Sequence, residues 1–445
     1  MQNVTMHLAR HVAAAQYADL PDAVRKEVAR ALLNWVGVAV GASRHETIDI
    51  ALRAIAPFAG PPQATVLGRR ERLDILNAAM LNGISSHVFD FDDTDLRTTV
   101  HPSAPVVPAL LALAEHRPMS GADFVLAMAL GIEAECRIAR SVMPQHQAIG
   151  WHPTGTCGVF GSAVATGKAI GLGAAHMAHA IGLAATQPVG IREMFGSMTK
   201  SFHPGRAAQS GMLSAFLAEQ GYTSSEQGIE AQRGWANVVS TQQDYTAIAE
   251  GLGESFEIMR NSYKPYACGL VVHPVIDGCI RLRAAHDLIP SMISGIDVDI
   301  HPIVMELTAK RTPSTGLEGK FSVYYAAAIG IVAGVAGEPE FSDAAVKDPV
   351  TIGLRDKVEP RIDSRLRQDQ ARVRITLTDG RVLEQFVEHA VGSVENPMSD
   401  RQLEAKFRDL VAGIVPAGRI QPLIDLCWQV ATLTDAGDIA RAAAA

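Results

Sequence analysis

Residues 89–103 read FDFDDTDLRTTVHPS and place four carboxylates, an arginine, three threonines and a histidine in one short loop. Apolar, helix-like runs flank this loop at residues 78–88 and 104–116. A proline follows His101 and disfavours helical geometry at that histidine, while Ser103 is a suitable cap for the next helix. We therefore expect His101 in a loop that faces a helix N-terminus.

Outside this loop, the first 250 residues show apolar side chains three and four positions apart, the spacing of packed helices. The clearest helices are predicted at residues 23–40, 74–89, 122–142, 159–170, 174–186, 206–219 and 225–232. The later helices are predicted at residues 322–335, 349–357, 400–415 and 421–431.

The pattern changes near Lys264. Residues 295–306 are rich in Ile and Val and predict a strand, and residues 371–384 predict two alternating strands joined by an Asp-Gly turn. The sequence therefore predicts a mainly α protein of two domains. Residues 1–264 and 398–445 would form a large all-helical domain, and residues 265–397 a smaller inserted α+β domain.

Composition limits the possible partners. A formal net charge of −8 argues against nucleic acid and against an anionic membrane, but a local cationic pocket for a small anion remains possible. The five cysteines form no C-x-x-C pair, so we expect reduced thiols in a cytoplasmic protein. No signal-peptide pattern and no uninterrupted apolar span of about 20 residues occurs, which predicts no membrane association.

Three histidines share a pattern in which His-Pro is followed by small or hydroxyl residues and a helix, namely His101, His152 and His203. A helix N-terminus favours anions, and a histidine held there stays neutral and suited to accept a proton. The alternative is that these histidines only cap helix-entry turns. For the three together, we favour at least one catalytic histidine.

Two lysines lie in charge-poor surroundings, Lys200 three residues before His203 and Lys264 at the predicted domain junction. Each is either a solvated surface residue or a buried counter-charge for an anionic ligand. Clefts between domains commonly bind substrates, so the second interpretation predicts an anion site at the junction.

The run from Asp90 to Asp95 also invites a metal hypothesis, because hard cations bind clustered carboxylates. It lacks the alternating spacing and the glycine of an EF-hand loop, and we expect no metal in the site. The two Gly-x-Gly elements follow no strand, so a nucleotide-binding loop is not indicated. A metal-dependent enzyme that uses Asp90, Asp92 and Asp93 remains an alternative.

Several segments, in order along the whole chain, resemble the MmgE/PrpD family, which includes 2-methylcitrate dehydratase, cis-aconitate decarboxylase and iminodisuccinate epimerase. The segments are Asp90–Thr94 with His101–Ser103, Gly150–Thr154, Thr199–Lys200 with Gly205–Ala208, Lys264–Tyr266 and Gly316–Ser322. The resemblance implies a helical domain with an α+β lid, a homodimer, and a cofactor-independent site in the cleft between the domains.

By the same resemblance, the implied site residues are Asp90, Thr94, His101, His152, Lys200, Lys264 and Tyr325. Tyr324 is the alternative to Tyr325 as the tyrosine that faces the cleft. A histidine of the decarboxylase branch is replaced here by Gly269, which argues against cis-aconitate decarboxylation.

The chemistry that these residues suit is proton transfer at a carbon beside a carboxylate. We expect Lys200 and Lys264 to bind substrate carboxylates, His101 and His152 to act as base and acid, and Asp90 to orient His101. Thr94 and Tyr325 would contact the substrate. Arg97 and Arg206 are further carboxylate-clamp candidates, although either could form a surface ion pair.

The first functional hypothesis is a hydro-lyase of the 2-methylcitrate dehydratase type that acts on a small di- or tricarboxylic acid. An epimerase or a decarboxylase of the same family is the alternative, because these reactions share proton transfer beside a carboxylate. A catalytically silent helical binding protein is a third hypothesis, which the retained histidines and lysines disfavour.

Overall fold

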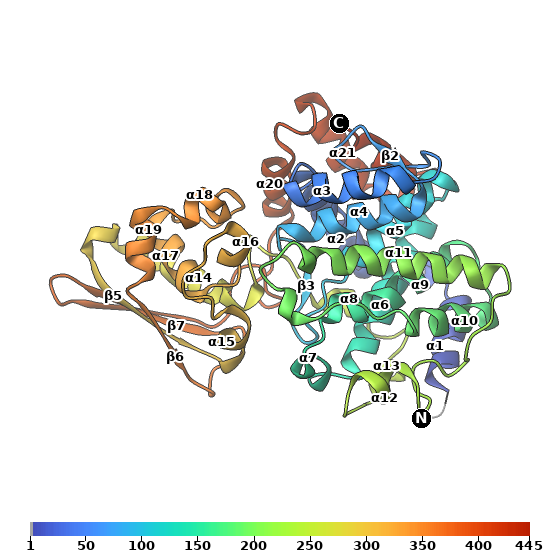
Figure 1. The fold of residues 1–445 in the computed structure, drawn as a ribbon, viewed down its shortest axis with the longest axis horizontal. Helices are drawn as coiled ribbons and strands as arrows, with labels where there is room; N and C mark the ends of the chain where they lie inside the picture. Colours follow the sequence, from blue (N-terminus) through green and yellow to red (C-terminus); the bar gives the residue numbers. More distant parts are fainter. Residues whose placement is uncertain (1–2) are drawn as a thin grey trace.

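The computed structural model describes residues 3–445 and shows two lobes, each with its own hydrophobic core (Figure 1). The core of the larger lobe, here called the helical lobe, draws on residues 4–263 and 398–443. The core of the smaller lobe, here called the sheet lobe, draws mainly on residues 267–377. The prediction of a mainly α protein is confirmed.

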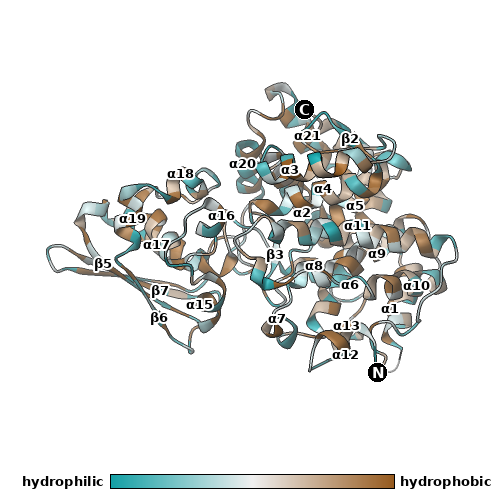
Figure 2. Ribbon diagram, in the orientation of Figure 1, coloured by the Kyte–Doolittle hydropathy of each residue, from teal (hydrophilic) through white to brown (hydrophobic). Residues whose placement is uncertain are grey.

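The helical lobe contains long central helices and several short outer ones. They are α1 (Val4–Ala14), α2 (Asp22–Gly41), α3 (Glu46–Ile55), α4 (Ile75–Val88), α5 (Ser103–His116), α6 (Gly121–Arg140), α7 (Gln145–Ile149), α8 (Pro153–Thr156), α9 (Gly158–Ala169), α10 (Ala174–Ala185), α11 (Thr199–Glu219), α12 (Trp235–Val239), α13 (Thr246–Ala249), α20 (Asp400–Val411), α21 (Ala417–Trp428) and α22 (Gly437–Ala442). In Figure 2 the outer helix α20 is largely hydrophilic, and its buried face packs against α2.

The helices α4 and α11 cross closely in the middle of this lobe. A Cβ atom added to Gly83 of α4 would lie 2.7 Å from the Cα of Gly205, and one added to Gly205 would lie 2.4 Å from the carbonyl oxygen of Met80. Only glycine permits so close an approach of two backbones. The crossing brings the end of α4 beside the beginning of α11, and both ends carry polar site residues.

The sheet lobe has one four-stranded sheet with strand order β6-β5-β7-β8. Its elements are α14 (His273–His286), β5 (Ile293–Ile300), α15 (Pro302–Thr308), α16 (Gly316–Gly319), α17 (Val323–Val332), α18 (Asp343–Val346), α19 (Pro349–Arg355), β6 (Val358–Ile362), β7 (Ala371–Leu377) and β8 (Val382–Val387). The strands β5 and β6 pair in parallel and the other pairs are antiparallel. Alternate residues of β7 are buried against α14, as expected for a sheet with one covered face.

The predicted strand pair at residues 371–384 is confirmed, with Gly380 in a left-handed turn at φ 87°. The predicted strand at residues 295–306 is half wrong, because β5 ends at Ile300 and α15 follows. His301 caps that helix, since its Nδ1 accepts a hydrogen bond from the amide of Ile303 at 3.1 Å. A His-Pro pair ends the strand here by starting a helix.

Two helix predictions also need correction. The helix predicted at residues 206–219 begins at Thr199, so His203 and Pro204 lie inside α11 and do not mark its entry. The helix predicted at residues 225–232 is absent, because that segment forms turns over α10 and the amide of Ile229 bonds to the Thr5 hydroxyl at 3.2 Å. Within residues 3–445, no helix is both long and apolar enough to cross a membrane.

Two small antiparallel pairs complete the fold. β1 (Ala64–Thr65) pairs with β2 (Arg72–Leu73), and β3 (Thr94–Asp95) pairs with β4 (Asn261–Ser262). The second pair matters for function because it fastens the acidic loop to the segment that leads into the sheet lobe.

The crossing of α4 and α11 predicts the effect of a small substitution. Gly205→Ala forces a methyl group against backbone atoms, and we expect a loss of about 1–3 kcal/mol in the free energy of unfolding. Calorimetry would register it as a lower unfolding temperature. Gly418→Ala is the matched control, because no atom lies within 4 Å of that added Cβ in α21. Equal unfolding temperatures for the two variants would contradict the packing argument.

Candidate active site

The acidic loop at residues 89–103 is largely buried and lies where the two lobes meet. Asp90 and Thr99 adopt left-handed backbone conformations, with φ values of 49° and 55°. Such conformations cost about 1–3 kcal/mol each for residues other than glycine and often mark functional sites. Thr94 and Asp95 pair with Ser262 and Asn261, which places Lys264 beside the loop.

A third lysine, Lys406, connects the acidic loop to Lys264. Lys406 of α20 is buried, and its ammonium donates to the carbonyl oxygens of Phe91 at 2.7 Å and of Lys264 at 2.9 Å. It also donates to the side-chain oxygen of Asn34 at 2.8 Å. The helix that follows the sheet lobe therefore fixes both the acidic loop and the lysine junction.

Asp90 receives two ammonium groups. Its Oδ1 accepts hydrogen bonds from Lys200 at 2.9 Å and from Lys264 at 2.8 Å, and Lys264 also donates to its carbonyl oxygen at 3.0 Å. Burial would raise the pKa of Asp90, but Lys200 and Lys264 hold it well below its usual range. Burial lowers the pKa of Lys200, and Asp90 opposes that change. The two cations exceed the single charge of Asp90, which suits an anionic substrate, while Asp92 adds a second negative charge nearby.

His101 stands next to this charged group, and its carboxylate partner differs from the expected one. Its Nδ1 lies 3.1 Å from Asp92 Oδ1 and 3.3 Å from the Thr94 hydroxyl, whereas Asp90 Oδ1 lies 3.9 Å from its Nε2. Asp92, and not Asp90, is therefore placed to orient His101. Burial lowers the pKa of His101, while Asp92 opposes that change.

Sequence reasoning missed His87, which shares Asp92 with His101. His87 Nδ1 lies 2.7 Å from Asp92 Oδ2, and its Nε2 lies 3.0 Å from the ammonium of Lys200. Because Asp92 can only accept, Nδ1 carries the proton and Nε2 accepts from Lys200. Burial lowers the pKa of His87 to about 3, so this histidine stays neutral at ordinary pH. The sequence signal that could have identified His87 as a site residue is its position at the end of a predicted helix, five residues before Asp92.

His152 is paired with another histidine. Its Nδ1 lies 2.9 Å from Nδ1 of His203 in α11, so one of these nitrogens donates and the other accepts. Burial lowers the pKa of His152 well below its usual range, and Lys200 adds to the effect. Burial also lowers the pKa of His203 to about 4. His203 was predicted as a helix-entry residue, and the structure makes it the partner of His152.

These groups surround a cavity of about 60 Å³, here called the inner cavity, with walls from both lobes. It is lined by Asp90, Thr94, Leu96, Thr99, His101, Gln147, His152, Pro153, Phe195, Lys200, Lys264, Gly269, Leu270, Val271, Leu307, Thr308 and Phe321. Six of the seven predicted site residues are among them. The walls near Phe195, Leu307 and Phe321 are apolar.

The seventh, Tyr325, is not among the lining residues. Its ring packs against Phe341 and its hydroxyl donates to the carbonyl oxygen of Glu340. Tyr324 instead lies under the guanidinium of Arg311, 5.1 Å from its ring centroid. Neither tyrosine reaches the inner cavity, and Phe321 takes the wall position on that side.

The two predicted arginine clamps also lie outside the cavity wall. Arg97 forms ion pairs with Asp95 at 3.0 Å and with Glu257, which explains the role of Asp95. Arg206 is exposed and donates to Gln209. Asp93 accepts from Ser103 at 2.5 Å and from Asn261, and burial raises its pKa to about 6. The contacts of Arg97, Asp95 and Asp93 hold the loop together.

A metal ion would have two possible ligand sets in this region. Asp90, Asp92 and His101 offer ligand atoms within 4.8 Å of one another, as do His87, His101 and His152. The ammonium groups of Lys200 and Lys264 occupy the same carboxylate, however, and a further cation would be repelled. The donor set therefore fits an anion better than a metal ion.

Two models of known protein families match consecutive parts of the chain. The model of the MmgE/PrpD N-terminal domain matches residues 6–248, and that of the C-terminal domain matches residues 266–430. The chain belongs to the MmgE/PrpD family. The second match extends beyond the sheet lobe into α20 and α21, which pack on the helical core.

The chain is also similar to curated relatives over nearly its full length. It is 26% identical to a cis-aconitate decarboxylase of Aspergillus terreus, over 94% of this chain and 91% of the relative. It is 26% identical to the human cis-aconitate decarboxylase, over 98% and 93%, and 25% identical to the mouse protein, over 99% and 93%. These relatives favour the decarboxylase alternative over the dehydratase expected first from the sequence.

The contact between Asp92 and His101 leads to a test of its own. Asp92→Asn removes the charge that supports a protonated His101, so the pKa of His101 should fall further. We expect the limb of the pH–rate profile assigned to His101 to move to lower pH, and turnover to drop by about 10²- to 10⁴-fold. An unchanged limb and unchanged turnover would show that Asp92 does not act on His101.

Proposed function

We propose that this protein is a cofactor-independent lyase that moves a proton at a carbon beside a carboxylate of a small di- or tricarboxylic acid. The observation that carries the proposal is the pair of buried ammonium groups on Asp90, next to two histidines in one cavity. One or both ammonium groups would bind the substrate carboxylate and stabilise negative charge as it develops. Family membership and the names of the relatives support the same class.

Decarboxylation of an acid like cis-aconitate is the first candidate reaction, because three relatives from different organisms carry that activity in their names. In such a step the bond to the departing carboxylate breaks, carbon dioxide leaves, and the electron pair stays on the carbon skeleton. The neighbouring carboxylate, held by Lys200 or Lys264, would share that charge. His101, whose imidazolium form Asp92 would stabilise, then delivers the proton to carbon.

Removal of water is the second candidate, and Gly269 favours it. The resemblance to decarboxylases leads us to expect a histidine at this position, whereas a Cβ added to Gly269 would meet its nearest atoms only at 3.6 and 3.8 Å. These are ordinary van der Waals distances, so a side chain would fit here, and its absence leaves that volume to a larger substituent of the substrate. In this reaction one histidine takes a proton from carbon and the other protonates the departing hydroxyl group.

In either reaction Asp92 would stabilise the imidazolium form of His101, and Thr94 would help to fix its ring. His203 would set the tautomer of His152 through the contact between their Nδ1 atoms. Tyr325 would only pack within the sheet lobe, against Phe341. The carboxylate of Asp90 would position the two lysines.

The domain arrangement is part of the proposal. Residues 265–397 would form a lid domain inserted into a helical domain made of residues 1–264 and 398–445. Separate cores and the return of α20 to α2 support this division. The family resemblance further suggests a homodimer, and the reduced-thiol composition suggests a cytoplasmic location.

The reaction class can be tested with a panel of citrate-like and succinate-like acids that includes cis-aconitate. We expect either release of carbon dioxide or formation of an unsaturated acid by loss of water, without added metal or cofactor. Gas release and absorbance would separate the two candidates. Turnover that appears only after a metal ion is added would contradict the proposal.

The residue roles can be tested on the acid that turns over. We expect His101→Ala and Lys200→Ala each to lower kcat by at least about 10²-fold, since each removes a proton-transfer group or a substrate charge partner. The exposed residues His116 and Lys347 provide the matched controls His116→Ala and Lys347→Ala, which should keep wild-type turnover. Wild-type turnover in both site variants would contradict the assignment.

A further inference from the structure

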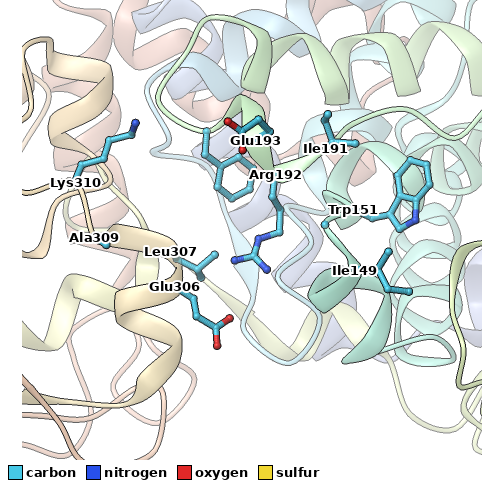
Figure 3. A pocket seen from close by; sticks show the side chains of 11 residues that line it. Ile149, Trp151, Ile191, Arg192, Glu193, Glu306, Leu307, Ala309 and Lys310 are labelled. Carbon is cyan, nitrogen blue, oxygen red and sulfur yellow. The ribbon is translucent and has the colours of Figure 1, made fainter.

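A larger space, here called the outer cleft, opens between the lobes directly outside the inner cavity (Figure 3). Its volume is about 840 Å³, and it is walled by residues of both lobes. Phe195 from the helical lobe and Leu307 from the sheet lobe line both the outer cleft and the inner cavity. The two spaces therefore adjoin.

The inner cavity is too small for the whole of a tricarboxylic acid. A water takes up about 30 Å³ in the liquid, so 60 Å³ holds roughly two waters. Pockets for small ligands usually enclose about 300–1,000 Å³. The inner cavity can hold the reacting carbons and one carboxylate, and the remainder of a longer acid would extend into the outer cleft.

Two cations stand at the rim of the outer cleft, one on each lobe. Arg192 donates from Nη1 to the carbonyl oxygen of Gln147 at 3.0 Å, and Gln147 lines the inner cavity. Lys310 donates from its amide to the carbonyl oxygen of Phe321 at 3.4 Å, and its Cε packs beside Gly196. In Figure 3 Lys310 extends from the sheet lobe at the left, and Arg192 extends from the helical lobe in the middle of the view. Neither forms an ion pair among residues 3–445.

Glu193 and Glu306 also line the outer cleft, so its wall carries two positive and two negative side chains. The empty cleft thus has no large excess of either charge. A carboxylate would be attracted at Arg192 and Lys310 and repelled at the two glutamates, which makes binding sensitive to where that carboxylate lies.

We propose that the outer cleft is a second compartment of the substrate site, in which Arg192 and Lys310 bind a distal carboxylate. This inference rests on the proposed function. The reacting end, with its own carboxylate, would lie in the inner cavity beside Lys200 and Lys264. The preferred substrates would then be acids with a carboxylate arm beyond the reacting carbons, and shorter dicarboxylates would bind less tightly.

Binding of two non-reacting acids tests this inference. Tricarballylate carries three carboxylates, whereas propionate carries one, which the inner cavity can hold. Calorimetric titration should show tighter binding of tricarballylate to the wild type. Arg192→Ala and Lys310→Ala should each weaken tricarballylate binding about tenfold and leave propionate binding within about twofold. Glu306→Gln should strengthen tricarballylate binding, because a repelling charge is removed.

The control is Arg206→Ala, which removes an exposed cation outside both spaces and should change neither affinity. Equal losses for both acids, or no loss for either, in the Arg192 and Lys310 variants would overturn the second compartment. Failure of the proposed function is distinguishable, because the wild type would then bind neither acid, whereas failure of the second compartment alone leaves both acids bound to the wild type.

Discussion

The site depends on one carboxylate oxygen, Asp90 Oδ1, which accepts hydrogen bonds from the ammonium groups of both Lys200 and Lys264. Removing either partner from a buried pair typically costs about 3–5 kcal/mol, because a charge is left without compensation. The contact joins three distant segments, namely the acidic loop, the start of α11 and the strand that leads to the sheet lobe. It also leaves one positive charge in excess, which a substrate carboxylate would neutralise.

Around this contact the histidines are arranged by a second shared carboxylate. Asp92 faces His87 with one oxygen and His101 with the other. His87 accepts from Lys200 and is kept neutral by burial, so the single charge of Asp92 is available to a protonated His101. The same network therefore couples Lys200, the proposed anion-binding lysine, to His101, the proposed proton-transferring histidine. His152 has a different partner, His203 of α11.

Much of this could be predicted from the sequence. Apolar periodicity located the main helices and the Asp-Gly turn located the hairpin, because these signals are local. The charge-poor surroundings of Lys200 and Lys264 left a surface position and a buried position open, and the structure buries both lysines at the inner cavity. The His-Pro pattern found His101 and His152 but misplaced His203, since a proline in the first turns of a helix gives the same local signal as one at its entry.

What could not be predicted were partners fixed by tertiary packing. Asp90 and Asp92 are two residues apart in one loop, and the left-handed backbone at Asp90 decides which carboxylate faces the lysines and which faces the histidines. His87 meets Lys200 only because Gly83 and Gly205 let α4 and α11 touch. Tyr325 was expected in the cleft from its place after Phe321 and Ser322, but α17 turns it towards Phe341.

The central claim is that His101 exchanges a proton with a carbon beside a carboxylate. The most direct measurement is deuterium incorporation at that carbon, by NMR, when a turned-over acid is incubated with the enzyme in D₂O. The account predicts deuterium at this carbon for the wild type, in the product of a decarboxylation or in recovered acid after reversible proton removal. It predicts none above background for His101→Gln, with binding of succinate retained. Undiminished incorporation in His101→Gln would contradict it.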